Sequence, residues 1–176
     1  MDAVPDLTCE TIETPIGDLL LIADGNGALR IVEFADCRHR MDCWLARRFR
    51  SGSSVIEGRV SEAIKASFAA YFDGNLAVLE QIPVALDGTA FQIEVWSALR
   101  RIVPGRTFAY GAFAESLGRP QSARAVGHAN GANPLSIVIP CHRLVGADGA
   151  LTNYGGGIER KRWLLEHEAR HAVGLV

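Results

Sequence analysis

The chain has 176 residues and a mass of 19.0 kDa, which suits one compact protein of one or two lobes. Apolar residues make up 48% of it and its mean hydropathy is +0.11, so a buried core is expected and disorder is not. No apolar run reaches the roughly eighteen residues of a membrane span, and the acidic N-terminus lacks the regions of a signal peptide. We therefore expect a cytoplasmic protein with reduced thiols and no membrane partner.

The net charge of −2 conceals two halves of opposite sign. Residues 1–88 hold 8 Lys and Arg against 14 Asp and Glu, whereas residues 89–176 hold 10 against 6. The second half also carries four of the five histidines. A basic half is typical of a lobe that binds a polyanion such as nucleic acid, although chance unevenness would also produce this modest charge.

The first half predicts an α/β lobe. Strands are expected over residues 11–14, 19–23 and 29–34, separated by turn sequences. Helices are expected over residues 40–50 and 61–71, and apolar residues recur at helical spacing in the second of them. Asp-Gly at positions 87 and 88 marks a boundary, so we predict two domains, 1–88 and 89–176.

The second half predicts a lobe of helices. Thr89 and Gln92 have the spacing of a capping box, and Pro104-Gly105 is expected to end the helix that they start. An apolar stripe lies between: Phe91, Val95, Leu99 and Ile102. Short helices over residues 110–117 and 120–132 form a helix–turn–helix pattern, which also occurs in proteins that bind no nucleic acid.

The helix expected over residues 120–132 carries unusually small side chains: Ser122, Ala123, Ala125, Gly127, Ala129 and Gly131. Such a helix can approach a narrow partner, or it can pack closely against another helix. Arg124 and His128 are four residues apart and share one face, which favours a nucleic-acid surface.

The apolar run at residues 136–139 predicts a buried strand, and Cys141 and His142 follow it directly. The thiolate, not the thiol, attacks electrophiles, and at a pKa of about 8.5 few thiols are ionised at neutral pH. A neighbouring imidazole can supply the missing activation. A structural thiol in the core is the alternative.

The segments after Cys141 predict a wing, a glycine-rich loop and a helix. Residues 144–146 and 150–152 flank Asp148-Gly149, which suits a tight hairpin turn. Three glycines at 155–157 would let the backbone approach a ligand closely.

A helix expected over residues 158–170 places Glu168 on the same stripe as Leu164 and Leu165. A carboxylate on an apolar face needs a partner, because burying it alone is costly. His142 is the candidate, and exposure of Glu168 at the frayed end of the helix is the alternative.

The four cysteines give no sign of a metal site. Cys37, His39 and Cys43 lie close in sequence, but their spacing matches none of the usual paired zinc ligands. We expect neither a metal nor a cofactor.

Several of these motifs, in this order and spacing, resemble the O6-alkylguanine-DNA alkyltransferase family: residues 124–127, 133–134, 140–143 and 153–157, with Glu168. The resemblance is closest to the free-standing bacterial methylated-DNA–protein-cysteine methyltransferases. It is dense over residues 89–168 and looser in the first half, where residues 14–19 resemble the opening hairpin of the family.

The resemblance implies a fold and an activity. The fold would be a small N-terminal ribonuclease-H-like α/β lobe followed by a mainly helical winged helix–turn–helix lobe that carries the active-site cysteine. The activity would be direct, irreversible transfer of an alkyl group from O6-alkylguanine, and O4-alkylthymine, in DNA to Cys141, once per molecule. The partner would be double-stranded DNA, bound through its minor groove by a monomer.

The resemblance also assigns residues at the acceptor. Cys141 would accept the alkyl group, and His142 would draw its proton through a water molecule. Glu168 would hold the imidazole in its charged form, so the pKa of Cys141 is expected below about 8.5. Asn133 would tie the recognition helix to the active-site strand.

On the DNA side, Tyr110 would rotate the 3′ phosphate and Arg124 would fill the gap that the extruded base leaves. The expected DNA contacts are Tyr110, Ala123, Arg124, Gly127, Asn130 and Gly131. The expected guanine pocket is formed by Leu144, Val145, Tyr154, Gly155 and Gly156. Ser136, Gly155 and Asn130 differ from some relatives, which leaves the range of alkyl groups open.

Two other classes fit less well. A cysteine hydrolase would need an oxyanion hole and a direct Cys–His contact, and its basic helix–turn–helix would have no use. A non-catalytic, alkyltransferase-like protein that flags lesions would replace the acceptor cysteine, and Cys141 argues against that class.

Overall fold

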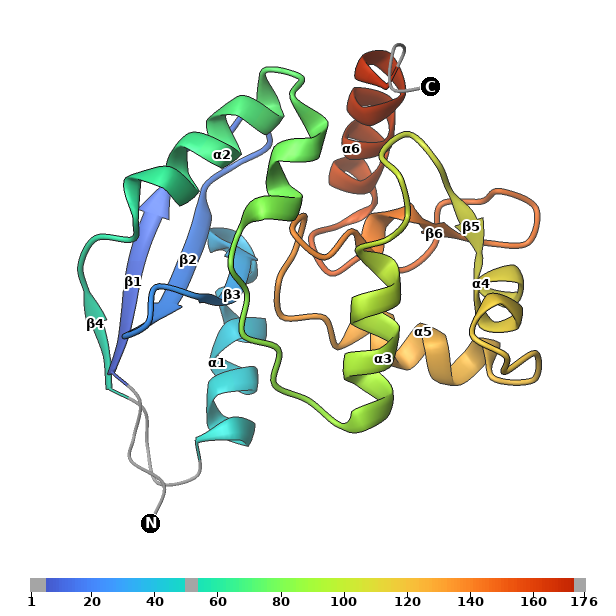
Figure 1. Cartoon of the computed structure of the whole chain (residues 1–176), viewed down its shortest axis with the longest axis horizontal. Coiled ribbons are helices and arrows are strands. Elements are labelled where there is room, and N and C mark those ends of the chain that lie inside the picture. The colour runs from blue at the N-terminus through green and yellow to red at the C-terminus, as the bar shows by residue number, and fades with distance from the viewer. Residues whose placement is uncertain (1–5, 50–53, 173–176) are drawn as a thin grey trace.

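The first half of the chain forms a four-stranded sheet in the order β3-β2-β1-β4. A computed structural model describes residues 6–49 and 54–172 (Figure 1). The strands are β1 (Asp6–Ile12), β2 (Leu19–Asp24), β3 (Leu29–Phe34) and β4 (Ser54–Glu57). The first three are antiparallel neighbours, and β4 runs parallel to β1 along the edge.

Two of the predicted strands agree with β2 and β3, whereas β1 begins five residues before the predicted one. Its pairing with β2 runs from Leu7 opposite Asp24 to Ile12 opposite Leu19, so the hairpin turn comes before residue 19 as expected. The sequence did not predict β4. This short edge strand exposes Ile56 by 56%, so it lacks the apolar alternation that reveals a buried strand.

Helices cover both faces of this sheet. On one face, α1 (Arg38–Arg48) packs with a small cluster that includes Leu7, Ile22 and Met41. On the other face, α2 (Glu62–Phe72) joins the main core, and short 3-10 helices follow β3 and α2, at Ala35–Cys37 and Leu76–Gln81. Both α-helices are within two residues of the described part of their predicted bounds, and residue 50 lies outside the described residues.

The second half is mainly helical. Its elements are α3 (Ala90–Leu99), β5 (Phe108–Ala109), α4 (Tyr110–Ser116), α5 (Ala123–Gly131), a 3-10 turn (Cys141–Arg143), β6 (Leu144–Val145) and α6 (Ile158–His171). Figure 1 shows α5 at the bottom of this half and the C-terminal end of α6 at the top. The fold is therefore the mixed α/β architecture expected, with a sheet lobe followed by helices.

The predicted capping box at the start of α3 is present. Thr89 Oγ1 accepts from Gln92 N at 3.2 Å, and Gln92 Oε1 accepts from Thr89 N at 2.9 Å. The helix ends at Leu99, although the apolar stripe continues to Ile102. Beyond Leu99 the chain continues in tighter turns, in which Arg101 N donates to Ala98 O and Ile102 N to Leu99 O, both at 3.0 Å, and Ile102 stays buried. The core cluster holds residues from both halves of the chain, and the division into two domains at 87–88 stays a prediction.

The run at residues 136–139, predicted as a buried strand, is a tight turn. Ile139 N donates to Leu135 O at 2.9 Å and Cys141 N donates to Ile139 O at 2.7 Å, so these donors are used within the segment. Ile137 has a φ of 71°, a left-handed conformation that is costly for a β-branched residue. The expected burial is correct, but the prolines on either side lack the N–H that a strand ladder needs.

The wing is also different from the prediction. The turn forms, with Gly146 N donating to Ala150 O at 2.9 Å, but residues 150–152 form no second strand. Instead, β6 pairs in parallel with β5, and this pairing occupies one edge of β6. In the described part of the chain, no helix has the length and apolar character that crossing a bilayer requires.

Candidate functional site

Cys141 lies at the start of the 3-10 turn and is only 6% exposed. Two asparagines hold the backbone around it. Asn133 Nδ2 donates to Ile139 O at 2.9 Å, and Asn130 Nδ2 donates to Cys141 O at 3.3 Å. Asn130 belongs to α5 and Asn133 follows it, so the end of this helix is tied directly to the segment that carries the thiol.

Glu168 on α6 forms the wall behind His142 and is fully buried. His142 Nε2 lies 2.8 Å from Glu168 Oε1, which is the contact expected from the sequence. Arg143 donates to the same carboxylate through Nε and Nη2, both at 2.8 Å. The hydroxyl of Tyr71 donates to it at 2.9 Å and the Gly105 amide at 3.3 Å. The alternative of an exposed Glu168 is wrong.

Arg143 gives the Glu168 carboxylate a second partner, and this one is permanently charged. Burial by itself raises the pKa of Glu168, but the contacts with His142 and Arg143 outweigh burial and hold the pKa far below its ordinary value. The carboxylate is thus ionised and already paired with the guanidinium of Arg143. Burial lowers the pKa of His142, against the attraction of Glu168. Burial thus opposes the charged imidazole that the sequence led us to expect.

A neutral His142 has one nitrogen available as a base. Because Nε2 faces an ionised carboxylate, it carries the proton and donates it to Glu168. Nδ1 is then the unprotonated nitrogen, and it is buried without a hydrogen-bond partner in the part of the chain that the structure describes. It can accept a proton from a nearby thiol or water.

The thiol of Cys141 is favoured over the thiolate in the resting protein. Burial raises its pKa, although the Asn133 amide and the positive charges of Lys161 and Arg40 act in the opposite direction. The expected low pKa is therefore wrong, because the sequence does not reveal how completely this sulfur is removed from water. Activation must come from a base that removes the proton as the sulfur reacts.

Lys161 on α6 was not predicted as part of the site. It is fully buried, and its Nζ donates to Leu144 O at 2.5 Å and to Thr152 O at 2.7 Å. Burial lowers its pKa, against the attraction of Cys141. Its ammonium group thus joins the segment just after Cys141 to the segment just before Tyr154. A lysine on a charged helix looks solvent-exposed in sequence, so only its spacing of seven residues from Glu168 hints at burial.

Of the residues expected to form the guanine pocket, Tyr154 lies next to His142, with the centroids of the two rings 6.3 Å apart. Leu144 and Val145 are buried, and the hydroxyl of Tyr154 is buried without a partner among the described residues. At Gly155 an added Cβ would clash with the guanidinium group of Arg40, so only glycine fits there unless Arg40 moves. Gly156 is closed in by the ring of Phe34 in the same way.

The expected DNA contacts divide into exposed and buried residues. Arg124 and Gly131 are exposed on α5, Ala123 and Gly127 are half-buried, and Tyr110 is half-buried at the start of α4. Asn130 is 4% exposed and faces Tyr110 and Cys141 instead of the surface, with Nδ2 3.5 Å from the Tyr110 hydroxyl.

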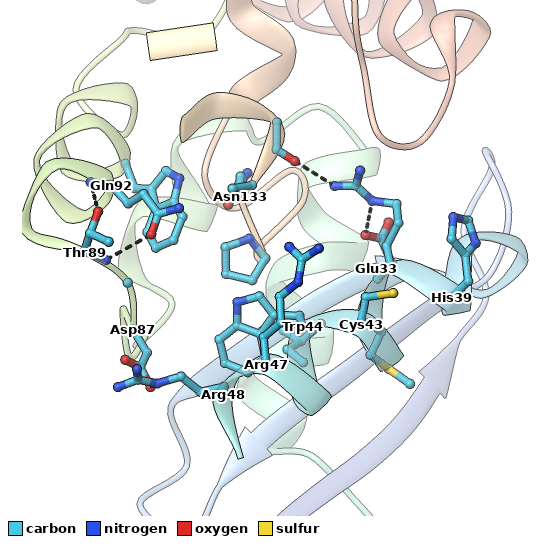
Figure 2. A pocket seen from close by; sticks show the side chains of 18 residues that line it. Glu33, His39, Cys43, Trp44, Arg47, Arg48, Asp87, Thr89, Gln92 and Asn133 are labelled. Carbon is cyan, nitrogen blue, oxygen red and sulfur yellow. Dashed lines mark hydrogen bonds and ion pairs between the residues drawn. The ribbon is translucent and has the colours of Figure 1, made fainter. Parts of the chain in front are cut away.

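A groove of about 520 Å³ lies next to this site, between α1, the start of α3 and the end of α5 (Figure 2). Arg40 lines this groove and also packs against Gly155, with its Nε 2.9 Å from Glu33 Oε2 and its Nη2 3.2 Å from Gly131 O. All four cysteines are free thiols, and only Cys43, in the groove, is exposed. Across residues 6–49 and 54–172, no three His, Cys, Asp or Glu side chains are placed to hold a metal ion.

Known proteins share both the sequence and the fold of this chain. The family model described as "6-O-methylguanine DNA methyltransferase, DNA binding domain" matches residues 90–170. The methylated-DNA–protein-cysteine methyltransferase of Salmonella typhimurium is 48% identical over 160 residues, which cover 90% of this chain and 94% of that protein. The crystal structure of the Mycobacterium tuberculosis O6-methylguanine methyltransferase has a TM-score of 0.78 and 41% identity, covering 94% of each chain. A structure of the M. tuberculosis protein in complex with DNA has a TM-score of 0.78 and 40% identity, covering 93% of this chain and 94% of that one.

Proposed function

We infer, because this chain belongs to the family of methylated-DNA–protein-cysteine methyltransferases, that it repairs DNA by moving the alkyl group of O6-alkylguanine to the sulfur of Cys141. The observation that carries this inference is the buried thiol of Cys141 beside a histidine whose Nδ1 is free, among the described residues, to accept a proton. O4-alkylthymine presents the same O-alkyl group next to a ring nitrogen and is a second substrate.

The transfer is a single displacement at carbon. His142 Nδ1 takes the proton of Cys141 through a water molecule, and the imidazolium that forms is stabilised by Glu168 at 2.8 Å. The sulfur attacks the alkyl carbon, the C–S bond forms, and the C–O6 bond breaks with its electron pair on guanine. The hydroxyl of Tyr154, free in the described structure, is the donor to the departing base.

The product explains why each molecule acts once. A thioether is cleaved neither by water nor by a neighbouring thiol, so the alkyl group stays on Cys141. The protein therefore acts as a single-turnover enzyme.

Access to the lesion requires extrusion of the base from the duplex, because a stacked guanine hides its alkyl carbon from in-line attack. The small residues of α5 suit the minor groove, where Arg124 is exposed and free of ion pairs among the described residues. Arg124 fills the gap in the stack, and Tyr110 at the start of α4 turns the neighbouring phosphate.

The assignment of Cys141 is tested with duplex DNA that carries O6-[methyl-³H]methylguanine. The label is expected on the tryptic peptide that contains Cys141, and the Cys141→Ser variant should remain unlabelled while keeping its melting temperature. Label on a peptide with Cys9, Cys37 or Cys43, or undiminished transfer by Cys141→Ser, would disprove the assignment.

The role of Arg124 is tested separately with a substrate that needs no extrusion. Arg124→Ala should slow repair of duplex DNA far more than it slows reaction with free O6-benzylguanine, and Arg101→Ala, another exposed arginine, is the matched control. Equal losses on the two substrates would place Arg124 in the pocket instead of in the DNA stack.

A further inference from the structure

The groove beside α1 is not used by the proposed chemistry, and Cys141 does not line it. Its floor is apolar and partly aromatic: Ile31, Met41, Trp44, Trp96 and Pro134. Three arginines and two carboxylates also line it: Arg40, Arg47, Arg48, Glu33 and Asp87. Figure 2 shows the Arg47 side chain extending from α1 into the groove.

The exposed face of α5 leads directly to this groove. Arg124, His128 and Gly131 are all exposed and are spaced four and three residues apart, so they form one stripe along the helix. Gly131 is the last member of that stripe and the last residue of α5. Its carbonyl accepts from Arg40 Nη2 at 3.2 Å, so α1 begins where the stripe ends.

The charge of α1 is opposite to that of its lobe. The first half of the chain has a net charge of −6, yet α1 contains four arginines and one aspartate. Arg40 pairs with Glu33, and Arg48 with Asp87, so these two arginines add no net charge to the groove. Arg47 is exposed and forms no ion pair with the described residues, so its guanidinium is free for an external anion.

The third wall of the groove is the start of α3, where Thr89 and Gln92 line the cavity. The N-terminal end of a helix of ten residues carries partial positive charge, which adds to that of Arg47 across the groove. The groove therefore favours an anion on two sides, and it continues the stripe of α5.

We propose that this groove is a second contact surface for the duplex that α5 binds, with Arg47 holding a phosphate of the strand that runs past Gly131. The proposal rests on the proposed function, because it needs DNA on α5. A guanidinium and a phosphate form a strong, charge-assisted pair that carries no sequence information. The groove therefore adds affinity and fixes the orientation of the duplex without changing which base is repaired.

The first test measures how binding of undamaged duplex DNA depends on salt. Removing one phosphate contact lowers the slope of log Kobs against log salt by about 0.9, so Arg47→Gln should lower the slope by about that amount. Affinity at about 0.1 M salt should fall several-fold. Arg47→Lys keeps the charge and should keep the slope.

Arg170→Gln is the matched control, since Arg170 is also exposed and also lies in the last turn of its helix, at the end of the molecule opposite α5 (Figure 1). It should leave the slope unchanged. An equal slope in Arg47→Gln and Arg170→Gln would overturn the proposal.

The second test uses a native probe, because Cys43 is exposed and lines the groove. Undamaged duplex DNA should slow modification of Cys43 by a maleimide, whereas the half-buried Cys9 on β1 should react at an unchanged rate. Equal Cys43 rates with and without saturating DNA would overturn the proposal. Protection of Cys43 by a polyglutamate peptide and not by DNA would overturn it in favour of an acidic-peptide site.

Failure of this proposal is distinguishable from failure of the proposed function. If the wild type transfers no methyl group from duplex DNA, the proposed function fails. If it transfers the group and Arg47→Gln binds like the wild type, only the role of the groove fails. Reaction with free O6-benzylguanine should be the same in both proteins, which shows that Arg47→Gln leaves the Cys141 site intact.

Discussion

The two sides of His142 differ in how completely their polar atoms are paired. Behind the ring, Glu168 accepts from five donors on four residues, all within 3.3 Å. In front of it, three buried polar atoms have no partner among the described residues: His142 Nδ1, Tyr154 Oη and Asn130 Oδ1. An unpaired buried polar atom costs about 1–3 kcal/mol. The wall contributes to the stability of the fold, whereas the pocket keeps unused hydrogen-bonding capacity for a ligand or water.

Removing the negative charge of Glu168 should have the largest effect on the free energy of unfolding. Glu168→Gln leaves Arg143 buried without a counter-ion, and breaking a buried pair in this way costs about 3–5 kcal/mol. Urea unfolding should show this loss. Glu159→Gln, on the same helix and exposed, should change stability little. A Glu168→Gln protein as stable as the wild type would mean that Arg143 finds water or another partner.

Lys161→Met should have an intermediate effect, because it removes the donor to Leu144 O and Thr152 O but also a buried charge. The two opposing changes leave a net loss of about 1–3 kcal/mol. Reaction with O6-benzylguanine should slow, since the pocket segments are no longer joined, and Lys161→Arg should restore part of the rate. Lys65→Met, the matched change at the other lysine of the chain, should leave that rate unchanged. An unchanged rate in Lys161→Met would limit Lys161 to a structural role.

The smallest effect should be a shift in the pH dependence of Cys141 modification. Burial raises the folded-state pKa of Cys141 above its unfolded value of about 8.5, so folding favours the thiol. This contribution to stability is present below about pH 8.5 and is lost as the pH rises through the folded-state pKa.

Iodoacetamide modification of Cys141, followed by peptide mass spectrometry, should therefore rise at higher pH in the folded protein than in the urea-unfolded chain. A folded profile that rises at lower pH would contradict the effect of burial on the Cys141 thiol and would favour a charged His142.

Local features were predictable from sequence where a short motif determines them. The capping box of Thr89 and Gln92 needs only three residues of separation, and it is present. The burial of Glu168 followed from its place on the leucine stripe of α6. The helix–turn–helix followed from two short helices and the turn between them, although α5 starts three residues later than expected.

Features that depend on distant residues were not predictable. Tyr71 and Glu168 are 97 residues apart in sequence, and nothing in either segment indicates their contact. The apolar run at 136–139 has the composition of a strand, but only Ser136 N donates to a strand, at Val32 O, whereas Val138 N and Ile139 N donate within the turn. The pairing of Arg143 with Glu168 joins residues 25 positions apart, and nothing in the sequence around either residue indicates it.

The most direct test of the proposed repair is a titration of methyl transfer against protein. A fixed amount of the protein is mixed with increasing O6-methylguanine duplex, and intact mass is measured together with the amount of guanine restored. The account predicts that repair stops at one guanine per protein molecule, with a single added methyl group that stays on the protein. Repair that continues beyond one equivalent, or protein that returns to its original mass, would contradict it.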